Sequence, residues 1–385
     1  MDNEVVEVRD IDPKDNESLI DISRRCPMIG SITAYYDRSP DYMAFYNLHG
    51  RFASEVPMEK RDLYPGNLWN AAVGELGGKI VGVLAYSYRI LLFRRQEIRV
   101  AYLMDARIDP DYQHKGIIKT IGFWAAGMYG YTQADCMMSY ILRGNKRAVD
   151  AFTKGGSMVF SGRQGGTFSL YQISMYRPYW ARGVKMERAT EADKKEIVEL
   201  LADFYGGYNF APVFNEENFA RMMKVSLGYS FNDIRVVREN GKIVALLGLW
   251  DEAPVRNVVV LKNTPVIRVA LVIAKFLRLF FKAPKPPEEG KPLRSLYIKH
   301  IACRPGYENV LKTMLKAVTN EVRRSKQIHF IWGAFHQADP LKDIFSGLTK
   351  TETQSDMYWG PWNTGWDSDP ENMTQEPAFA DFSLV

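Results

Sequence analysis

The sequence contains an internal repeat, and this repeat constrains the fold more than any other feature. A glycine turn at Gly78 separates two apolar, β-branched runs, and the same turn recurs at Gly241 in RVVRENGKIVALLGLW. Such spacing is typical of tight hairpins. Upstream of each hairpin the sequence reads as a strand, an acidic helix start and an amphipathic helix. We therefore expect two tandem copies of one α/β (α+β) unit, residues 1–182 and 183–385, each a mixed central sheet flanked by helices.

Composition limits the classes of function. The three cysteines lie far apart without a CxxC pair, which favours a reducing compartment. The first residues are acidic and form no apolar run, so we see no secretory signal and expect a cytoplasmic protein. The five histidines form no HxxxH or HExxH pair, and the chain has no GxSxG or Walker motif. We expect no metal and no serine-hydrolase chemistry.

A strand, a sharp turn and a helix follow one another between residues 98 and 128. The strand pattern ends near Ile108 and the helix pattern opens near Ile117, with Gln113 and Gly116 in the turn between them. A glycine turn that leads into a helix directs several unpaired N–H groups, and the positive end of the helix dipole, at one point. This segment is therefore predicted to bind an anion.

Two motifs here resemble those of a known family. The run IDPDYQHKGII resembles motif A of the GNAT acyltransferase superfamily, Q/RxxGxG/A, and NKRAVDAFTKGGS resembles its second motif, NxxAxxxYxxxGF, through Asn145, Ala148, Phe152 and Gly156. The resemblance implies two tandem GNAT-like domains with acyl-coenzyme A as cosubstrate. The second copy keeps Pro305 but is shorter after it and lacks the matching glycine, so it is expected to be a degenerate domain without a coenzyme site.

The resemblance also assigns roles to residues of the first copy. The amides of residues 113–118 would hold the coenzyme pyrophosphate, the backbone of residues 106–108 would pair with the pantetheine arm, and Asn145 would face the thioester. The implied coenzyme-binding residues are Ala106, Arg107, Ile108, Gln113, His114, Lys115, Gly116, Ile117, Ile118, Asn145 and Phe152.

Two positions depart from the family pattern. Ile118 stands where glycine or alanine is usual, which crowds the pyrophosphate side but keeps the backbone donors. Phe152 stands where the family commonly has a tyrosine that protonates the leaving thiolate. The usual general acid is therefore missing from this chain.

Acyl transfer to an amine needs a base and a proton for the departing thiolate. Asp105, three residues before Ile108, is the candidate base, although a carboxylate on this strand could instead cap a turn or pair with an arginine. Tyr140, on the strand before Asn145, is the candidate replacement acid. A thiolate can also leave without assistance.

The segment after the first predicted helix is expected to form the acceptor wall. It is rich in aromatic residues, which offer both apolar area and hydrogen bonds. The predicted acceptor-binding residues are Tyr35, Tyr36, Asp37 and Tyr42. Near the other terminus, Trp359, Trp362 and Trp366 either cover the cleft or fill the second core.

An insertion at about residues 256–292 separates two strands of the second copy. It contains a predicted helix over residues 265–282, with Thr264 as N-cap, Pro265 as first residue, and a stripe of four cations on an otherwise apolar surface. Four cations argue against a membrane span. Packing against its own domain or across a homodimer is the commoner role of such a helix, and peripheral contact with the inner face of a membrane is the alternative.

The net charge of the chain is concentrated in this insertion. Six basic and no acidic residues lie between Arg256 and Lys282, against a formal net charge of +5 for the whole chain. A local basic site favours a membrane surface or an acidic partner and not nucleic acid. We predict an acyl-CoA-dependent N-acyltransferase, most simply an acetyltransferase, for a small-molecule or lipid-like amine. The alternative is a non-catalytic acyl-CoA binding or sensing module.

Overall fold

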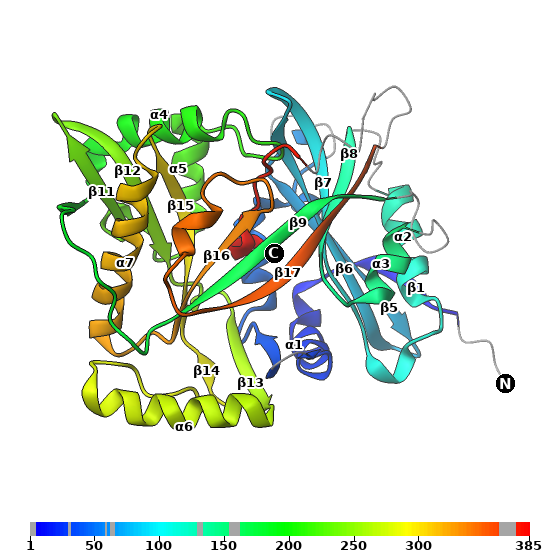
Figure 1. Ribbon diagram of the computed structural model, residues 1–385. Helices are drawn as coiled ribbons and strands as arrows, with labels where there is room; N and C mark the ends of the chain where they lie inside the picture. Colours follow the sequence, from blue (N-terminus) through cyan, green and yellow to red (C-terminus); the bar gives the residue numbers. More distant parts are fainter. Residues whose placement is uncertain are drawn as a thin grey trace.

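The computed structural model describes residues 5–29, 32–57, 60–61, 66–128, 134–153, 162–361 and 375–385. Gly156, Trp362 and Trp366, which the sequence analysis singled out, lie outside these residues. The two halves of the chain lie side by side, and the C-terminus lies between them near the centre of the molecule (Figure 1).

The first half contains one long run of sheet with helices on both sides. Its strand boundaries at Ile108 and its helix start at Ile117 are those predicted from the sequence. Its elements are β1 (Glu7–Asp10), α1 (Asn16–Arg25), β2 (Met28–Ile29), β3 (Ile32–Asp37), β4 (Arg51–Phe52), β5 (Leu68–Leu76), β6 (Lys79–Phe93), β7 (Gln96–Ile108), α2 (Ile117–Met128), β8 (Cys136–Leu142), α3 (Lys146–Thr153) and β9 (Arg163–Ser174).

The second half repeats this order with an insertion. The predicted hairpin at Gly241 is present as β11 and β12, and it corresponds to the hairpin of β5 and β6 in the first half. The elements are β10 (Met186–Arg188), α4 (Lys194–Tyr205), α5 (Glu216–Val225), β11 (Ile234–Glu239), β12 (Lys242–Trp250), β13 (Asn257–Asn263), α6 (Pro265–Phe280), β14 (Pro292–Leu293), β15 (Ser295–Cys303), α7 (Glu308–Ser325), β16 (Phe330–His336) and β17 (Lys350–Pro361).

The two halves exchange their last strands. Strand β17 of the second half lies between β8 and β9 of the first, and β9 in turn pairs with β16 of the second half. Figure 1 shows β9 and β17 crossing the molecule from one half to the other. The predicted boundary near residue 182 falls between β9 and β10, but the sheet continues across the halves, because each last strand completes the sheet of the other half.

A second, smaller sheet joins the insertion to the predicted acceptor wall. Its strand order is β14-β13-β3-β2, and β13 pairs with β3 from Asn257 opposite Asp37 to Asn263 opposite Ile32. The sequence analysis predicted the helix of the insertion but not β13. Apolar residues of β3 and β13, among them Ala34, Val258 and Val260, pack in one buried cluster, and no local sequence pattern indicates this pairing.

The hydrophobic core is shared. One large buried cluster contains Trp69 and Val100 from the first half together with Phe219 and Trp250 from the second. The fold is therefore stabilised across the halves and not only within each. Among the helices that the structure describes, none has both the length and the apolar composition to cross a bilayer.

Candidate active site

Strands β7 and β8 run parallel and then separate. They pair at Val100, Ala101 and Tyr102, and the last link is a hydrogen bond of 3.0 Å from the Ser139 hydroxyl to the carbonyl of Leu103. From there to Ile108, β7 pairs with β6 on its other edge only, among the described strands. Ala106 is accordingly exposed although it lies within a large sheet. The open edge at residues 103–108 offers backbone groups to an extended ligand.

A β-bulge lies where β7 leaves β8. Asp105 and Ala106 together face Leu84 of β6, because the register shifts between Val83 and Ala85. Asp105 has a φ of 54°, in the left-handed region. A bulge bends its strand and redirects one side chain, and here the side chain of Asp105 turns into the interior.

The predicted anion loop follows β7. His114 and Gly116 both have positive φ, 68° and 73°, on either side of Lys115. The first backbone bonds of α2 run from the amides of Lys119 and Thr120 to the carbonyl of Gly116. The amides of residues 115–118 therefore precede the bonded turn, as in an anion-binding helix start. A Cβ added at Gly116 would meet no atom within 4 Å, so the space beside the loop is open.

Cations from several elements lie around this loop. Lys115 lies over the ring of Tyr112 at 5.0 Å, and Lys79 of β6 lies over the same ring at 5.0 Å. Arg147, near the start of α3, donates to the side-chain oxygen of Gln113. The loop thus combines backbone donors with positive charge, which is the chemistry that a pyrophosphate group requires.

Four other residues that the resemblance assigned to coenzyme binding have side chains that pack in the core or cap a helix. Ile117 and Phe152 are buried, and Ile118 packs against the same apolar cluster. The oxygen of the Asn145 carboxamide accepts a 3.2 Å hydrogen bond from the amide of Ala148, so this exposed side chain caps α3. The side chain of Asn145 is thus used at the helix start.

Asp105 is the centre of a buried polar network. One carboxylate oxygen accepts from Arg38 (2.6 Å), Tyr42 (2.8 Å) and Tyr46 (2.5 Å), and the other accepts from Nε of Arg107 (2.6 Å). Burial alone would raise the pKa of Asp105, but the two guanidinium groups and the hydrogen bonds hold it far below its ordinary value. A carboxylate in this state is a weak base, and the geometry favours the arginine-paired alternative.

Tyr140 lies across the opening from Asp105, on β8. Its hydroxyl donates to the carbonyl of Phe379 at 3.1 Å, and its ring contacts those of Tyr102, Phe168 and Phe382 at centroid distances of 5.2 to 5.9 Å. Burial raises the pKa of Tyr140 well above its ordinary value. The phenol therefore keeps its proton at neutral pH, and it is a weaker acid than an exposed tyrosine.

The four predicted acceptor-binding residues divide into two pairs. Tyr42 is fully buried against Asp105, and the ring of Tyr36 lies 4.5 Å from the guanidinium carbon of Arg256. Asp37 is partly exposed, accepts from Ser39 (2.7 and 3.1 Å) and lies 3.7 Å from Arg24. Tyr35 alternates with Tyr36 along β3 and so points to the other face. Only Tyr36 and Tyr42 are brought to the interior.

The sequence analysis missed the C-terminal segment, residues 375–385. It lies between the halves, where Phe379 contacts Tyr205 at 4.9 Å and the carboxylate of Asp381 pairs with Nζ of Lys299 at 3.0 Å. Burial favours the neutral acid, but Lys299 and Ser383 hold the pKa of Asp381 below its ordinary value. The one sequence signal was the apolar pair Phe379 and Phe382, which does not reveal where the segment packs.

A buried ion pair borders the same interior. Nε of Arg256 lies 2.6 Å from Oε2 of Glu252, and Arg256 also donates to the carbonyl of Val385 at 2.6 Å. The guanidinium group lies over the rings of Tyr36 and Phe45. Arg256 therefore ties the insertion to the acceptor segment and the C-terminal segment, a role that its place in a basic stretch did not suggest.

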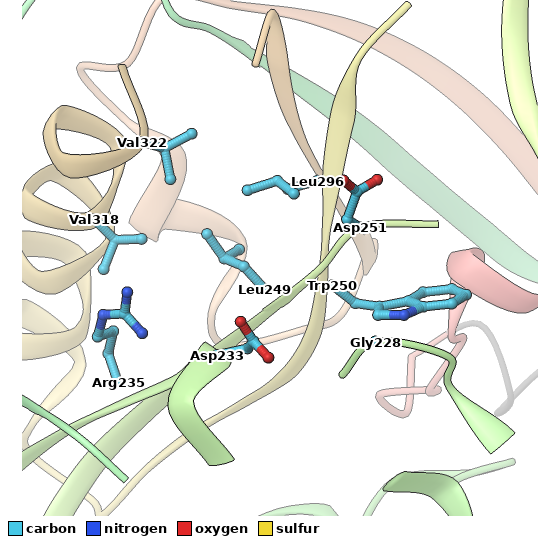
Figure 2. Close-up of a pocket in the computed structure, with 9 residues that line it drawn as sticks. All are labelled: Gly228, Asp233, Arg235, Leu249, Trp250, Asp251, Leu296, Val318 and Val322. Atoms are coloured by element: carbon cyan, nitrogen blue, oxygen red, sulfur yellow. The ribbon is translucent and has the colours of Figure 1, made fainter. Parts of the chain in front are cut away.

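A cavity of about 130 Å³ lies in the second half. Figure 2 shows Leu249, Leu296, Val318 and Val322 around it. The side chain of Arg235 pairs with Glu321 at 2.6 Å, and that of Asp233 accepts from the amide of Ser230 at 2.8 Å. Val318 and Val322 belong to the C-terminal part of α7, so the cavity is remote from the turn at Pro305 that corresponds to the anion loop.

Comparison with solved structures identifies the fold of the chain. No protein-family model matches the sequence, and no curated protein matches it. Among solved structures, the chain is similar to N-myristoyltransferase of Saccharomyces cerevisiae with bound myristoyl-CoA, with 11% identity, a TM-score of 0.59, and coverage of 99% of this chain and 86% of that one.

Two further structures share the arrangement. A tandem GNAT protein from the clavulanic acid biosynthesis pathway has 11% identity and a TM-score of 0.55, with 94% of this chain and 100% of that one covered. A GCN5-related glucosamine N-acetyltransferase region of a fungal multi-domain protein has 13% identity and a TM-score of 0.59, with 94% of this chain and 38% of that one covered. The protein therefore has the GNAT fold in tandem form, as its motifs and internal repeat predicted.

Proposed function

We propose that this protein transfers an acyl group from acyl-coenzyme A to an amine. The observation that carries this proposal is the open edge of β7, which leads from the anion loop at residues 113–118 to the interior that contains Asp105 and Tyr140. Such an opening suits a long, flexible thioester with an anionic end. The similar structures, an N-myristoyltransferase with bound myristoyl-CoA and a glucosamine N-acetyltransferase region, agree with it.

Each part of the coenzyme has a place in this proposal. The amides of residues 115–118, with Lys115 and Arg147 nearby, bind the pyrophosphate. The backbone of residues 106–108 pairs with the pantetheine arm along the open edge. The thioester then lies near the end of the β7–β8 pairing, close to Tyr140.

The transfer itself needs few groups. The neutral amine attacks the thioester carbon, and the resulting oxyanion accepts a hydrogen bond from a backbone amide at the open edge of β7. The carbon–sulfur bond then breaks, and the coenzyme sulfur takes the proton of Tyr140. The proton that the amine nitrogen loses returns to the Tyr140 oxygen through water, so the phenol is restored and the step balances. Because the pKa of Asp105 is strongly lowered, we assign this residue to the positioning of Tyr42 and Tyr46 in the acceptor wall.

The acceptor is proposed to be a small or lipid-like amine, and acetyl the simplest acyl group. Aromatic side chains of the acceptor segment, such as Tyr36 and Tyr42, provide apolar area beside buried charges. Strand β13, which pairs with β3 of this segment, leads directly into the exposed helix α6. An amphiphilic amine fits both features.

The proposal is tested by thiol release. Acetyl-, octanoyl- and myristoyl-CoA would be incubated with polyamines, amino acids, peptides and lipid amines, and free thiol would be measured together with coenzyme binding by calorimetry. Thiol release that depends on the amine supports the enzyme. Tight binding without any release would support the binding or sensing module, and absence of binding would contradict both.

Tyr140→Phe is expected to lower kcat by about tenfold to a thousandfold, the range of a lost general acid, while the affinity for acyl-CoA stays unchanged. The substitution removes the hydroxyl of Tyr140 together with its hydrogen bond to the carbonyl of Phe379, and the ring contacts are retained. Steady-state kinetics with acyl-CoA and the best amine would measure the effect.

Tyr171→Phe is the matched control, because Tyr171 lies on β9 away from the opening and contacts Phe345 of the second half. It should leave kcat unchanged. If Tyr140→Phe and Tyr171→Phe were equally active, thiolate departure would be unassisted and the assignment of Tyr140 would be dropped.

A further inference from the structure

Helix α6 presents an apolar face to solvent. Phe280 is 80% exposed, Leu279 77%, Val266 76% and Phe276 63%. A soluble domain rarely exposes so many large apolar side chains in one place unless the patch binds something. The exposed apolar residues of this face are Val266, Val269, Val272, Ile273, Phe276, Leu279 and Phe280.

The body of the protein fixes the orientation of this face. On its inner side, Ala274 and Leu277 pack against Tyr176. Both ends are held as well: the amide of Asn263 donates to Glu289 at 2.9 Å before the helix, and Arg323 donates to the carbonyl of Lys282 at 2.8 Å after it. The helix lies along the outer edge of the molecule in Figure 1. Packing against its own domain, the commoner role of such a helix, therefore accounts for one side only.

The cations flank the apolar face and do not interrupt it. At 3.6 residues per turn, the exposed apolar side chains span an arc of about 140°, and the three cations within the helix span an adjacent arc of about 80°. Those three are Arg268, Lys275 and Arg278, and a fourth cation, Lys282, follows just beyond the end of the helix. A broad apolar arc beside a basic stripe is the pattern of a helix that lies in the headgroup region of a membrane.

Charge favours anionic lipid over a second copy of the chain. Arg256 is buried against Glu252, but the five basic residues from Lys262 to Lys282 are exposed, and no acidic residue lies among them. The two acidic residues that follow, Glu288 and Glu289, are already near Lys285 (2.5 Å) and Arg268 (3.7 Å). A second copy would therefore place cations opposite cations, whereas phosphate and carboxylate headgroups neutralise them.

Area also argues against a dimer through this face. The helix has 16 residues, which corresponds to a length of about 24 Å and a width of about 10 Å. The resulting face covers roughly 240 Å², against the roughly 800 Å² per partner that a stable protein interface buries. A bilayer needs no matching partner surface and accommodates a single helix.

We propose that α6 docks this protein on an anionic bilayer. Phe276, Leu279, Phe280 and the valines of the outward face enter the boundary between headgroups and acyl chains, and the four flanking cations contact the headgroups. This interaction does not depend on acyl transfer and concerns a surface remote from the anion loop.

Sedimentation with vesicles tests this proposal. The full chain is expected to sediment with vesicles of phosphatidylcholine and phosphatidylserine and to bind vesicles of phosphatidylcholine alone far more weakly. Lys275→Glu/Arg278→Glu should lower the partition coefficient on anionic vesicles by about thirtyfold or more. Phe276→Ser/Phe280→Ser should lower it by at least about tenfold, and added salt should weaken binding of the parent chain.

Matched variants elsewhere on the surface provide the controls. Lys185→Glu/Lys195→Glu makes the same charge change at two exposed lysines, and Trp180→Ser removes an apolar side chain that is 73% exposed. Both should sediment like the parent. The proposal is overturned if anionic vesicles fail to sediment the protein, if the α6 variants behave like the controls, or if light scattering shows a dimer that only the α6 variants dissociate.

Discussion

Gly116→Asp is expected to weaken acyl-CoA binding by roughly a hundredfold, because a carboxylate would then repel the phosphates at the anion loop. The open space beside Gly116 admits the side chain without a clash, and its φ of 73° makes the cost to folding about 1 kcal/mol. Isothermal titration calorimetry with coenzyme A and with acyl-CoA would measure the loss of affinity.

Gly306→Asp is the matched control for this variant. Gly306 lies in the turn before α7, which corresponds to the anion loop in the second half, and it also has positive φ (87°) and open space. Because the second copy is not expected to bind coenzyme, this variant should bind acyl-CoA like the parent chain. Normal binding by Gly116→Asp would show that the loop at residues 113–118 is not the pyrophosphate site, and equal loss in both variants would indicate a general effect on the fold.

Asp105→Asn is expected to lower the free energy of unfolding by about 3 to 5 kcal/mol. The substitution removes the counter-charge of Arg38 and Arg107, and both guanidinium groups remain buried beside a neutral amide. Urea unfolding followed by tryptophan fluorescence would give the difference. Such a loss is a large fraction of the stability of a typical domain.

The pH dependence of this effect has a definite sign. The pKa of Asp105 is lowered by folding, so its contribution is fully present above the ordinary carboxyl pKa of about 4 and is lost as the pH falls toward the lower pKa of the folded state. The parent chain should therefore lose stability below about pH 4 more steeply than Asp105→Asn, which has no such carboxylate to protonate.

Asp111→Asn provides the comparison at the surface. Asp111 pairs with Arg25 at 2.5 Å, but its side chain is 69% exposed, and solvent screens such surface pairs, so this variant should unfold like the parent chain. If Asp105→Asn instead kept its stability and lost turnover with an altered pH profile, Asp105 would be the catalytic base that its place on β7 first suggested.

The local elements of this fold could be predicted from the sequence. The hairpins at Gly78 and Gly241, the strand end at Ile108 and the helix start at Ile117 depend on neighbouring residues, because turns and helix starts are decided within a few positions. The helix of the insertion follows the same rule, although it ends at Phe280 and the side chain of Thr264 forms no cap bond. The motifs around these elements were sufficient to indicate the GNAT fold.

The centre of the molecule could not be predicted in this way. Arg38 and Asp105 are 67 positions apart and meet only because β7 carries a bulge, and Tyr140 contacts Phe379 across 239 positions. The sequence indicated candidate residues without their partners. The sequence therefore left two roles open for Asp105, catalytic base or partner of an arginine, and its buried ion pairs favour the second.

By itself, the sequence determined the two α/β copies, the anion loop and the amphipathic helix, since each depends on periodicity and turn residues close together in the chain. Only the tertiary structure decided that β17 inserts between β8 and β9, that residues 375–385 lie between the halves, and that the apolar face of α6 points to solvent. Strand pairing and burial depend on surfaces that distant segments bring together. Many strands share the same alternating pattern, so the pattern does not identify the strand with which each one pairs.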